Sequence, residues 1–169
     1  YASAGAGTTS HLAAEIFKTM AGVDILHIPY KGNVPAITDL LGGQTSMLFA
    51  TLPTVLPQVK ADKLRGIAVL GSTRSTALPN LPTVSEAGLK GFDVNNWTGL
   101  FAAAGTPAPV VARMNAEVQK AMRLPEIQAR LANEGLRFVP TTPDEFGSFV
   151  KAEVARWAPV VKASGAKAD

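Results

Sequence analysis

The stretch YASAGAGTTSHLAAE, residues 1–15, carries a loop rich in glycine and hydroxyl groups that runs directly into helical sequence. Leu12, Ile16 and Met20 recur at helical spacing, and Gly22 follows them as a stop signal. This pattern predicts an amphipathic helix over residues 10–21. Such a loop points backbone N–H groups and the positive end of the helix dipole away from the helix. It therefore either holds a small anion or serves as a plain turn with hydroxyl caps.

Strand and helix patterns alternate over the first 70 residues. Near-continuous apolar runs predict strands at 24–29, 45–50 and 64–70, while residues 33–42 and 52–62 carry helix patterns with Pro near their starts. Strands that are apolar on both faces and alternate with helices are typical of a parallel sheet covered by helices. The sequence therefore predicts the α/β class.

The composition changes after residue 70. Residues 71–91 are rich in Ser, Thr, Pro and Gly, which predicts a connector with at most one helical turn, at 83–87. Residues 94–104 and 136–139 are apolar enough to predict further strands. The connector therefore separates two structured parts of the chain.

Three helices are predicted in the last third. The first starts at Pro107 and turns an apolar face inward, and the second spans residues 125–135. Thr142 and Glu145 fit a capping box at the start of the third. Pro159 is expected to kink or end that last helix.

The opening loop lacks the features of the common phosphate motifs. A P-loop needs Lys followed by Ser or Thr after its last Gly, and a dinucleotide fingerprint needs a third Gly where this chain has Ser10. The remaining features are two glycines, three hydroxyl residues and a helix start. They suit a carboxylate best, if the loop binds a ligand at all.

Two further loops are expected beside the first, because the carboxyl ends of parallel strands share one edge of a sheet. Tyr30 and Lys31 follow the second predicted strand, and Thr51 follows the third. Tyr30 offers a hydroxyl and Lys31 a cation. The alternatives are an aromatic lid on the core for Tyr30 and a solvated charge for Lys31.

The inventory of reactive side chains is small. The chain has no Cys and two histidines, His11 and His27, without metal-ligand spacing, so we expect no metal, no cofactor and no catalysis. His11 either hydrogen-bonds locally or donates to an anion, and His27 is expected to be a satisfied imidazole in the core. The 16 basic residues are scattered among acids, which argues against nucleic-acid binding despite the net charge of +3.

Six motifs in order resemble one family: SAGAGTTSHLAAE, HIPYKG, AITDLLGGQ, KLRGIAVL, LPNLPTVSEAG and RWAPVVKASGA. They are similar to the Bug family, the periplasmic solute receptors of tripartite tricarboxylate transporters. The resemblance implies a periplasmic-binding-protein-like (type II) lobe with a parallel or mixed sheet flanked by helices, plus the C-terminal part of the other lobe. It covers essentially the whole chain.

The resemblance also implies a domain organisation. Residues 3–70 would form the second ligand-binding lobe, 71–91 a connector, and 92–169 the C-terminal part of the first lobe, which is incomplete without an N-terminal segment. Such receptors close two lobes on a small carboxylate, with hinges expected near residues 1–3 and 68–72, and present it to the membrane components of the transporter. An unpaired sheet edge in 92–104 would favour dimers or swapped strands.

The family's ligand-binding positions fall on six residues here. They are Ser3, Gly5, Gly7, Thr8, Tyr30 and Thr51. Many relatives place an acidic residue at the end of the third strand, whereas this chain has Ala50. This difference disfavours a ligand with an ammonium group and favours a di- or tricarboxylate or an aromatic acid.

Three functions of different classes follow from the sequence. The first is a periplasmic solute receptor, and the second is a hydrolase or transferase on the same α/β scaffold acting on a small anionic substrate. The third is a regulatory or interaction domain. Chemical turnover of a carboxylate would separate the first from the second, and a failure of every small acid to shift the melting temperature would favour the third.

Overall fold

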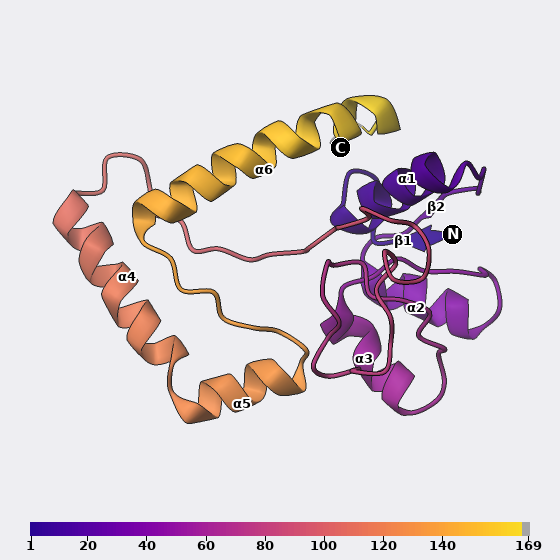
Figure 1. Ribbon diagram of the computed structural model, residues 1–169, viewed down its shortest axis with the longest axis horizontal. Helices are drawn as coiled ribbons and strands as arrows, with labels where there is room; N and C mark the ends of the chain where they lie inside the picture. The colour runs from indigo at the N-terminus through magenta and orange to yellow at the C-terminus, as the bar shows by residue number, and fades with distance from the viewer. Residues whose placement is uncertain (167–169) are drawn as a thin grey trace.

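The computed structural model describes residues 1–166, which form a small parallel sheet and six helices (Figure 1). The strands are β1 (Ala2–Ser3) and β2 (Ile28–Pro29), and the helices are α1 (Thr9–Ala21), α2 (Asn33–Leu41), α3 (Leu52–Lys60), α4 (Ala108–Met122), α5 (Pro125–Asn133) and α6 (Pro143–Ser164). The α/β class with a parallel sheet is therefore confirmed.

The sheet is built around β1. Ala2 pairs with Ile28 of β2 on one side and forms a parallel bridge to Leu48 on the other. The amide of Ala2 donates to the carbonyl of Met47 at 2.8 Å, and the amide of Ile28 donates to the carbonyl of Tyr1 at 2.8 Å. Three chain segments therefore run side by side in the same direction.

The strands are much shorter than the apolar runs predict. The run 24–29 pairs only at Ile28–Pro29, 45–50 only at Leu48, and 64–70 only at Val69, which bridges Thr83. Residues 94–104 and 136–139 form no strand in the described structure, so those two predictions were wrong. A strand exists only where a neighbour supplies backbone partners, and β1 supplies two residues to its neighbours.

The helices agree closely with the sequence pattern. Thr8 caps α1, whose C-terminal cap is Gly22 in the left-handed region at φ 65°. The capping box of Thr142 and Glu145 is present at the start of α6. Of the two outcomes expected at Pro159, a kink or an end, the structure excludes the end, because α6 continues to Ser164 with Pro159 inside it.

The hydrophobic core lies in the first 94 residues. Phe92 is 1% exposed and is surrounded by apolar side chains of α1, residue 49 and the segment around residues 84–94. Its ring meets that of Phe17 edge-on, with centroids 6.5 Å apart. Trp157 of α6 packs against this core, which ties the C-terminal helix to α1.

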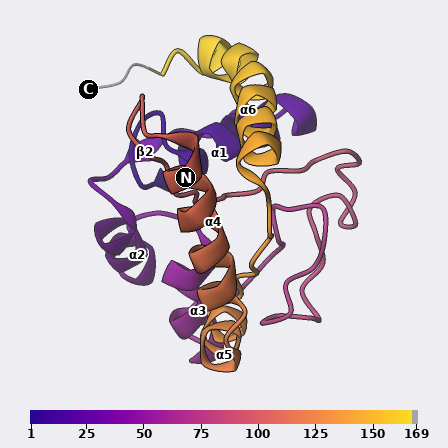
Figure 2. The ribbon, with the colours of Figure 1, turned by 90° about the vertical axis from the view of Figure 1, so that its left-hand side faces the viewer.

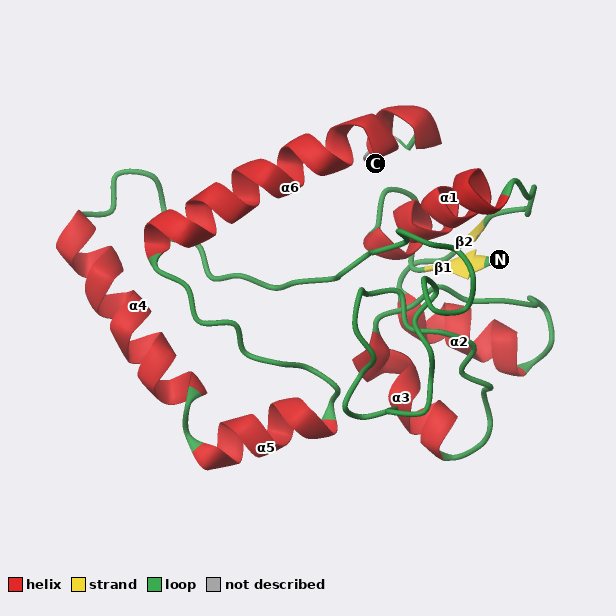
Figure 3. Ribbon diagram, in the orientation of Figure 1, coloured by secondary structure: helices red, strands yellow, loops and turns green. Residues whose placement is uncertain are grey.

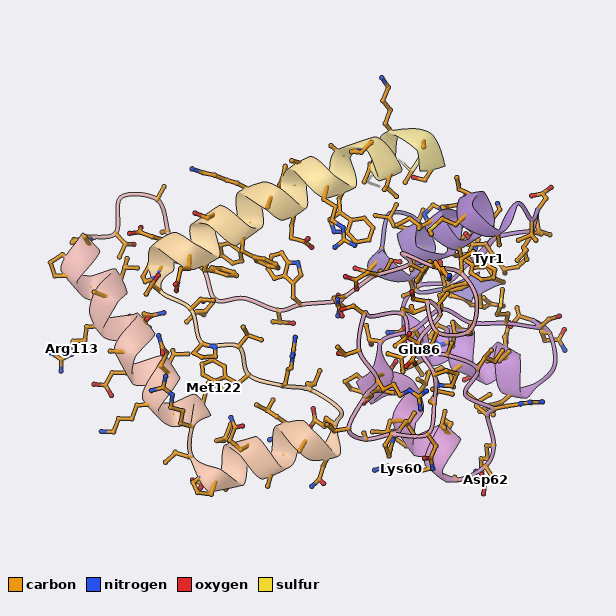
Figure 4. The ribbon with its side chains drawn as sticks, viewed as in Figure 1. Tyr1, Lys60, Asp62, Glu86, Arg113 and Met122 are labelled. Carbon is orange, nitrogen blue, oxygen red and sulfur yellow. The ribbon has the colours of Figure 1, made fainter. Side chains whose placement is uncertain are left out.

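Helices α4, α5 and α6 form an open frame beside this core. In Figures 1 and 2, α6 lies beside α1, and Figure 1 shows α4 and α5 on the side of the molecule opposite the sheet. Figure 3 shows the long loop path that joins α3 to α4. The face of α4 that the sequence predicts to be inward is partly open, since Val110 is 49% and Met114 54% exposed. Arg113 points to the outer side of this helix (Figure 4).

Candidate functional site

The loops after β1 and β2 lie side by side at one edge of the sheet. The amide of Tyr30 donates to the carbonyl of Ser3 at 3.1 Å, and the amide of Gly32 donates to the carbonyl of Ala4 at 3.0 Å. Because Leu48 flanks β1 on the other side, the segment that leads to Thr51 starts from the same sheet. The sheet therefore brings the opening loop next to Tyr30, at one edge, as the parallel strand direction predicts.

Gly5 is the tightest point of the opening loop. Its φ of +134° is a conformation that side chains disfavour, and a Cβ at this position would lie 3.1 Å from the carbonyl oxygen of Tyr30. Gly7 also has a positive φ, +74°, but faces open space. Gly5 is therefore required for the close approach of the two loops, whereas Gly7 is required only for the turn.

Several donors of the opening loop already have partners. The amide of Gly5 donates to Ser3 Oγ at 3.2 Å, and the amide of Gly7 donates to His11 Nδ1 at 3.1 Å. The amide of Thr8 reaches the carbonyl of Gly5 at 3.4 Å, and the Thr8 hydroxyl donates to the same carbonyl at 2.7 Å. The prediction that these amides are free was therefore wrong.

Other amides of the same turn remain open. Among residues 1–166, no hydrogen bond takes up the N–H groups of Ala6, Thr9 or Ser10. Thr9 and Ser10 form the first turn of α1, where amides have no partner within the helix and carry the positive end of its dipole. The anion-attracting groups of this loop therefore lie between the two glycines, at Ala6, and in the first turn of α1, at Thr9 and Ser10.

Both histidines lie directly under the loop. His27 Nε2 is 2.6 Å from Ser3 Oγ, and the rings of His27 and His11 are stacked with centroids 4.2 Å apart. Burial lowers the pKa of each imidazole, and for His27 the neighbouring His11 adds to this effect. Of the two roles expected for His11, the structure shows the local hydrogen bond. His27 has a polar partner, as expected, but it is half-buried and not fully in the core.

The other sequence-predicted residues are less available. The Tyr30 hydroxyl donates to Asp39 Oδ2 at 2.8 Å, which raises the pKa of this tyrosine. Thr51 precedes the first residue of α3, and its hydroxyl lies 3.4 Å from that of Thr54. Lys31 is exposed. Tyr30 therefore lies beside the opening loop with its hydroxyl turned to α2.

The structure adds two residues that sequence reasoning missed. Asn96 Oδ1 accepts a hydrogen bond of 3.4 Å from the Thr9 hydroxyl, which links the connecting segment to the start of α1. Glu153 Oε2 accepts from the indole N–H groups of Trp97 at 3.0 Å and Trp157 at 3.1 Å. The polar pair within VNNW was the available signal for Asn96; Glu153 gave none.

Two hollows of the surface lie away from the opening loop. One of about 450 Å³ runs along α4 at residues 115–123, and one of about 310 Å³ lies between Val59 and residues 77–81. Neither is lined by the opening loop. Within residues 1–166 no group of three or more His, Asp or Glu side chains is arranged to hold a metal ion. No helix in this part of the chain has the length and apolarity to cross a membrane.

A family model described as "Tripartite tricarboxylate transporter family receptor" matches residues 1–166. The chain belongs to this receptor family. The family expected from the six motifs is therefore confirmed.

The receptor family includes curated and structurally solved relatives of this chain. Protein BugT of Bordetella pertussis is 36% identical over 161 residues, which cover 95% of this chain and 49% of BugT. The structure of R. palustris Rpa4515 with adipate matches with a TM-score of 0.86 and 35% identity, over 95% of this chain and 54% of that one. MatC from Rhodopseudomonas palustris with bound malate matches with a TM-score of 0.79 and 32% identity, over 95% and 56%.

The receptor's fold is thereby confirmed as that of a periplasmic binding protein, since Rpa4515, MatC and BugD all superpose on it. The chain spans about half the length of these relatives. The matched half does not by itself establish which ligand and which partners a full-length receptor binds.

Proposed function

We propose that this chain is part of a periplasmic solute receptor that binds a small carboxylate for uptake by a tripartite tricarboxylate transporter. The observation that supports this most directly is the family match over residues 1–166. Two structural relatives carry adipate and malate, and both are dicarboxylates. A dicarboxylate, a tricarboxylate or an aromatic acid is the ligand class.

The carboxylate binds at the edge where the opening loop enters α1. The open amides of Ala6, Thr9 and Ser10 supply donors, and the helix dipole supplies a favourable potential. The six sequence-predicted residues form the surroundings, with Ser3 and Gly5 setting the loop's shape and Thr8 capping the helix. Tyr30 and Thr51 flank the ligand from the neighbouring loops.

The receptor closes on its ligand by a hinge movement. Residues 3–70 form one lobe, 71–91 a connector, and 92–169 part of the other lobe, of which 167–169 lie outside the described residues. Hinges near residues 1–3 and 68–72 let the first lobe, to which residues 92–169 belong, cover the loop edge of the second lobe. The contact of Thr9 with Asn96 already joins the two lobes near that edge.

Apolar side chains are exposed in the segment 92–104, which supports the binding of another protein segment there. Leu100 and Phe101 are 66% and 65% exposed, and the segment around them pairs with no strand in the described structure. A segment equivalent to the rest of the relatives' length covers this surface in a full receptor; in this chain alone, dimers or swapped strands cover it. The closed receptor then docks on the membrane components of the transporter.

The receptor binds its ligand without changing it. Ser3 and His27 form the only short hydroxyl–imidazole contact in residues 1–166, but the Ser3 hydroxyl is buried and also bonded to Gly5 within the loop. A hydrolase or transferase on the same scaffold is the alternative. Incubation with adipate and malate, followed by mass analysis, would favour the alternative if altered product were recovered.

Thermal shift and calorimetry with a panel of acids test the proposal. We expect adipate, malate or an aromatic acid to raise the melting temperature, and the neutral diamide of adipate to leave it unchanged. A Thr9→Pro variant removes one open amide at the first residue of α1, and Thr9→Val, which loses the same hydroxyl but keeps the amide, is the control. A panel in which acids and neutral amides behave alike would contradict the proposal and favour an interaction domain.

A further inference from the structure

Three rings are stacked beneath the opening loop. The Tyr1 ring lies 4.8 Å from that of His27 at an interplanar angle of 14°, and His27 lies 4.2 Å from His11 at 9°. Tyr1 and His11 are buried, and Tyr1 lies beneath α1 (Figure 4). Two of these rings can carry a proton charge, and both contact the loop through a ring nitrogen.

The contacts of His11 fix its protonation state. His11 Nδ1 accepts a hydrogen bond of 3.1 Å from the amide of Gly7, so this nitrogen carries a lone pair. In the neutral ring the proton is therefore on Nε2, which lies 4.0 Å from Glu15 Oε1. A proton added to Nδ1 would set one N–H against another and break the bond to Gly7.

His27 acts on the same loop from the other side. Its Nε2 lies 2.6 Å from Ser3 Oγ, and that hydroxyl accepts from the amide of Gly5 at 3.2 Å. Because the two imidazoles are stacked at 4.2 Å, a charge on one opposes a charge on the other. The pair can therefore hold one proton far more easily than two.

The charged groups around the pair are few. Glu15 faces His11, but it also accepts hydrogen bonds from the Tyr1 hydroxyl at 2.8 Å and from Lys18 Nζ at 3.2 Å. Lys18 is the nearby positively charged side chain, and it disfavours a charged imidazole at both histidines. The pKa of each histidine lies below its ordinary value of 6.5, chiefly because of burial. The neutral pair is thus the resting form above pH 6.5, and acidification adds the proton.

We infer that neutral His11 is a positioning residue that holds the amide of Gly7, and that a proton taken up on His11 Nδ1 releases this amide for a ligand oxygen. The inference rests on the proposed function, because it concerns the same loop. A carboxylate oxygen in front of Gly7 would accept from its amide and from the new Nδ1–H of His11 together. Carboxylate binding and proton uptake therefore favour each other.

Nuclear magnetic resonance of the chain without added carboxylate tests the switch directly. From about pH 8 to about pH 5, the amide resonance of Gly7 is expected to shift with the same midpoint as the His11 ring resonances, below 6.5. His11→Asn is the matched variant, because its side-chain oxygen replaces the Nδ1 acceptor and does not titrate. In this variant the Gly7 resonance is expected to stay at its neutral position throughout.

A further variant and the titration of His27 complete the test. In His11→Ala, Gly7 is expected to show its acidic position at every pH, and in both His11 variants the His27 midpoint is expected to rise because the opposing charge of His11 is removed. The inference is overturned if Gly7 does not move while His11 titrates, or if it moves equally in His11→Asn. Failure of adipate and malate to bind would instead count against the proposed function. The Gly7 titration needs no carboxylate and would still test the switch.

Discussion

Residues 1–94 and residues 105–166 differ in what their apolar side chains contact. In the first region, side chains from α1 and the loops enclose Phe92, which is 1% exposed. In the second, none of the residues of α4, α5 and α6 is buried, and Met114 of α4 is 54% exposed. The first region thus has a core of its own, while the second reaches that core only through Trp157.

This difference shows that an apolar stripe on a helix does not ensure that the stripe is buried. Helices α1 and α4 both carry an apolar stripe at helical spacing, and α1 buries Leu12, Ala13 and Ala14 because the sheet and loops lie against it. The stripe of α4 is covered only in part among the described residues: Val111, Val118 and Met122 are half-buried, and no residue of the helix is buried. Since burial of apolar area is the main favourable term in folding, the second region has less stability of its own.

The largest expected effect comes from truncating one aromatic ring in each region. Phe92→Ala removes a fully buried ring and should lower the free energy of unfolding by about 3–5 kcal/mol. Phe149→Ala in α6, whose ring is 40% exposed, should lower it by about 1–2 kcal/mol. Urea denaturation of both variants measures the difference; equal losses would show that the second region has a core comparable to the first.

The glycines of the opening loop sharpen the description of the first region. Gly5→Ala should cost about 1–3 kcal/mol, because φ is +134° and the new Cβ would lie 3.1 Å from the Tyr30 carbonyl oxygen. Gly7→Ala, at φ +74° in open space, should cost about 1 kcal/mol. Melting temperatures of the two variants give the order, and a reversed order would mean that the loops do not approach as described.

The N-cap residues of α1 and α6 allow the same substitution to be compared in the two regions. Thr8→Ala at α1 and Thr142→Ala at α6 should each cost about 1 kcal/mol through loss of a capping hydroxyl. Thr8 should cost more, because its hydroxyl also donates to the Gly5 carbonyl and lies 2.9 Å from Ser10 Oγ. Thr8→Ser, which keeps the hydroxyl, is the control and should behave like the parent chain in thermal unfolding.

The smallest effect concerns Glu153 of α6, which joins the second region to the segment before it through Trp97 and also accepts from Trp157 within α6. Burial raises the pKa of Glu153, but hydrogen bonds from both indoles and Arg156 outweigh it, so the pKa lies below its ordinary 4.5. The link is therefore fully present above pH 4.5 and is lost as the pH falls through the lower folded-state value. Tryptophan fluorescence should change over that acidic range.

The chain has two tryptophans, and both donate to Glu153, so the signal reports this link. Glu153→Gln cannot titrate and should give a flat fluorescence profile across the same range. A transition that persists in this variant would assign the change to another group.

Helix positions were largely predictable from the sequence, whereas strand lengths were not. Thr8, Gly22 and the Thr142–Glu145 box act within a few residues of one another, so their effect is visible in the sequence. The runs 24–29 and 64–70 are equally apolar, but pairing depends on which distant segment lies alongside. Leu26 and Ile67 accordingly remain 76% and 70% exposed.

The candidate site was predictable as a place but not as a set of donors. Parallel strand direction puts Ser3 and Tyr30 at one edge, and the structure agrees. The bond from Gly7 to His11 and the pairing of His27 with Ser3 depend on three-dimensional proximity that spacing does not encode. The role of the six predicted residues in binding stays a prediction.

The sequence by itself determined the helix ends, the α/β class and the family, because caps, apolar periodicity and motif order are local properties of the chain. Only the tertiary structure decided which apolar faces are buried, which amides of the opening loop remain open, and that the two histidines stack under it. The physical reason is that burial, strand pairing and hydrogen-bond partnership are relations between segments, and such relations exist only once the chain has brought those segments together.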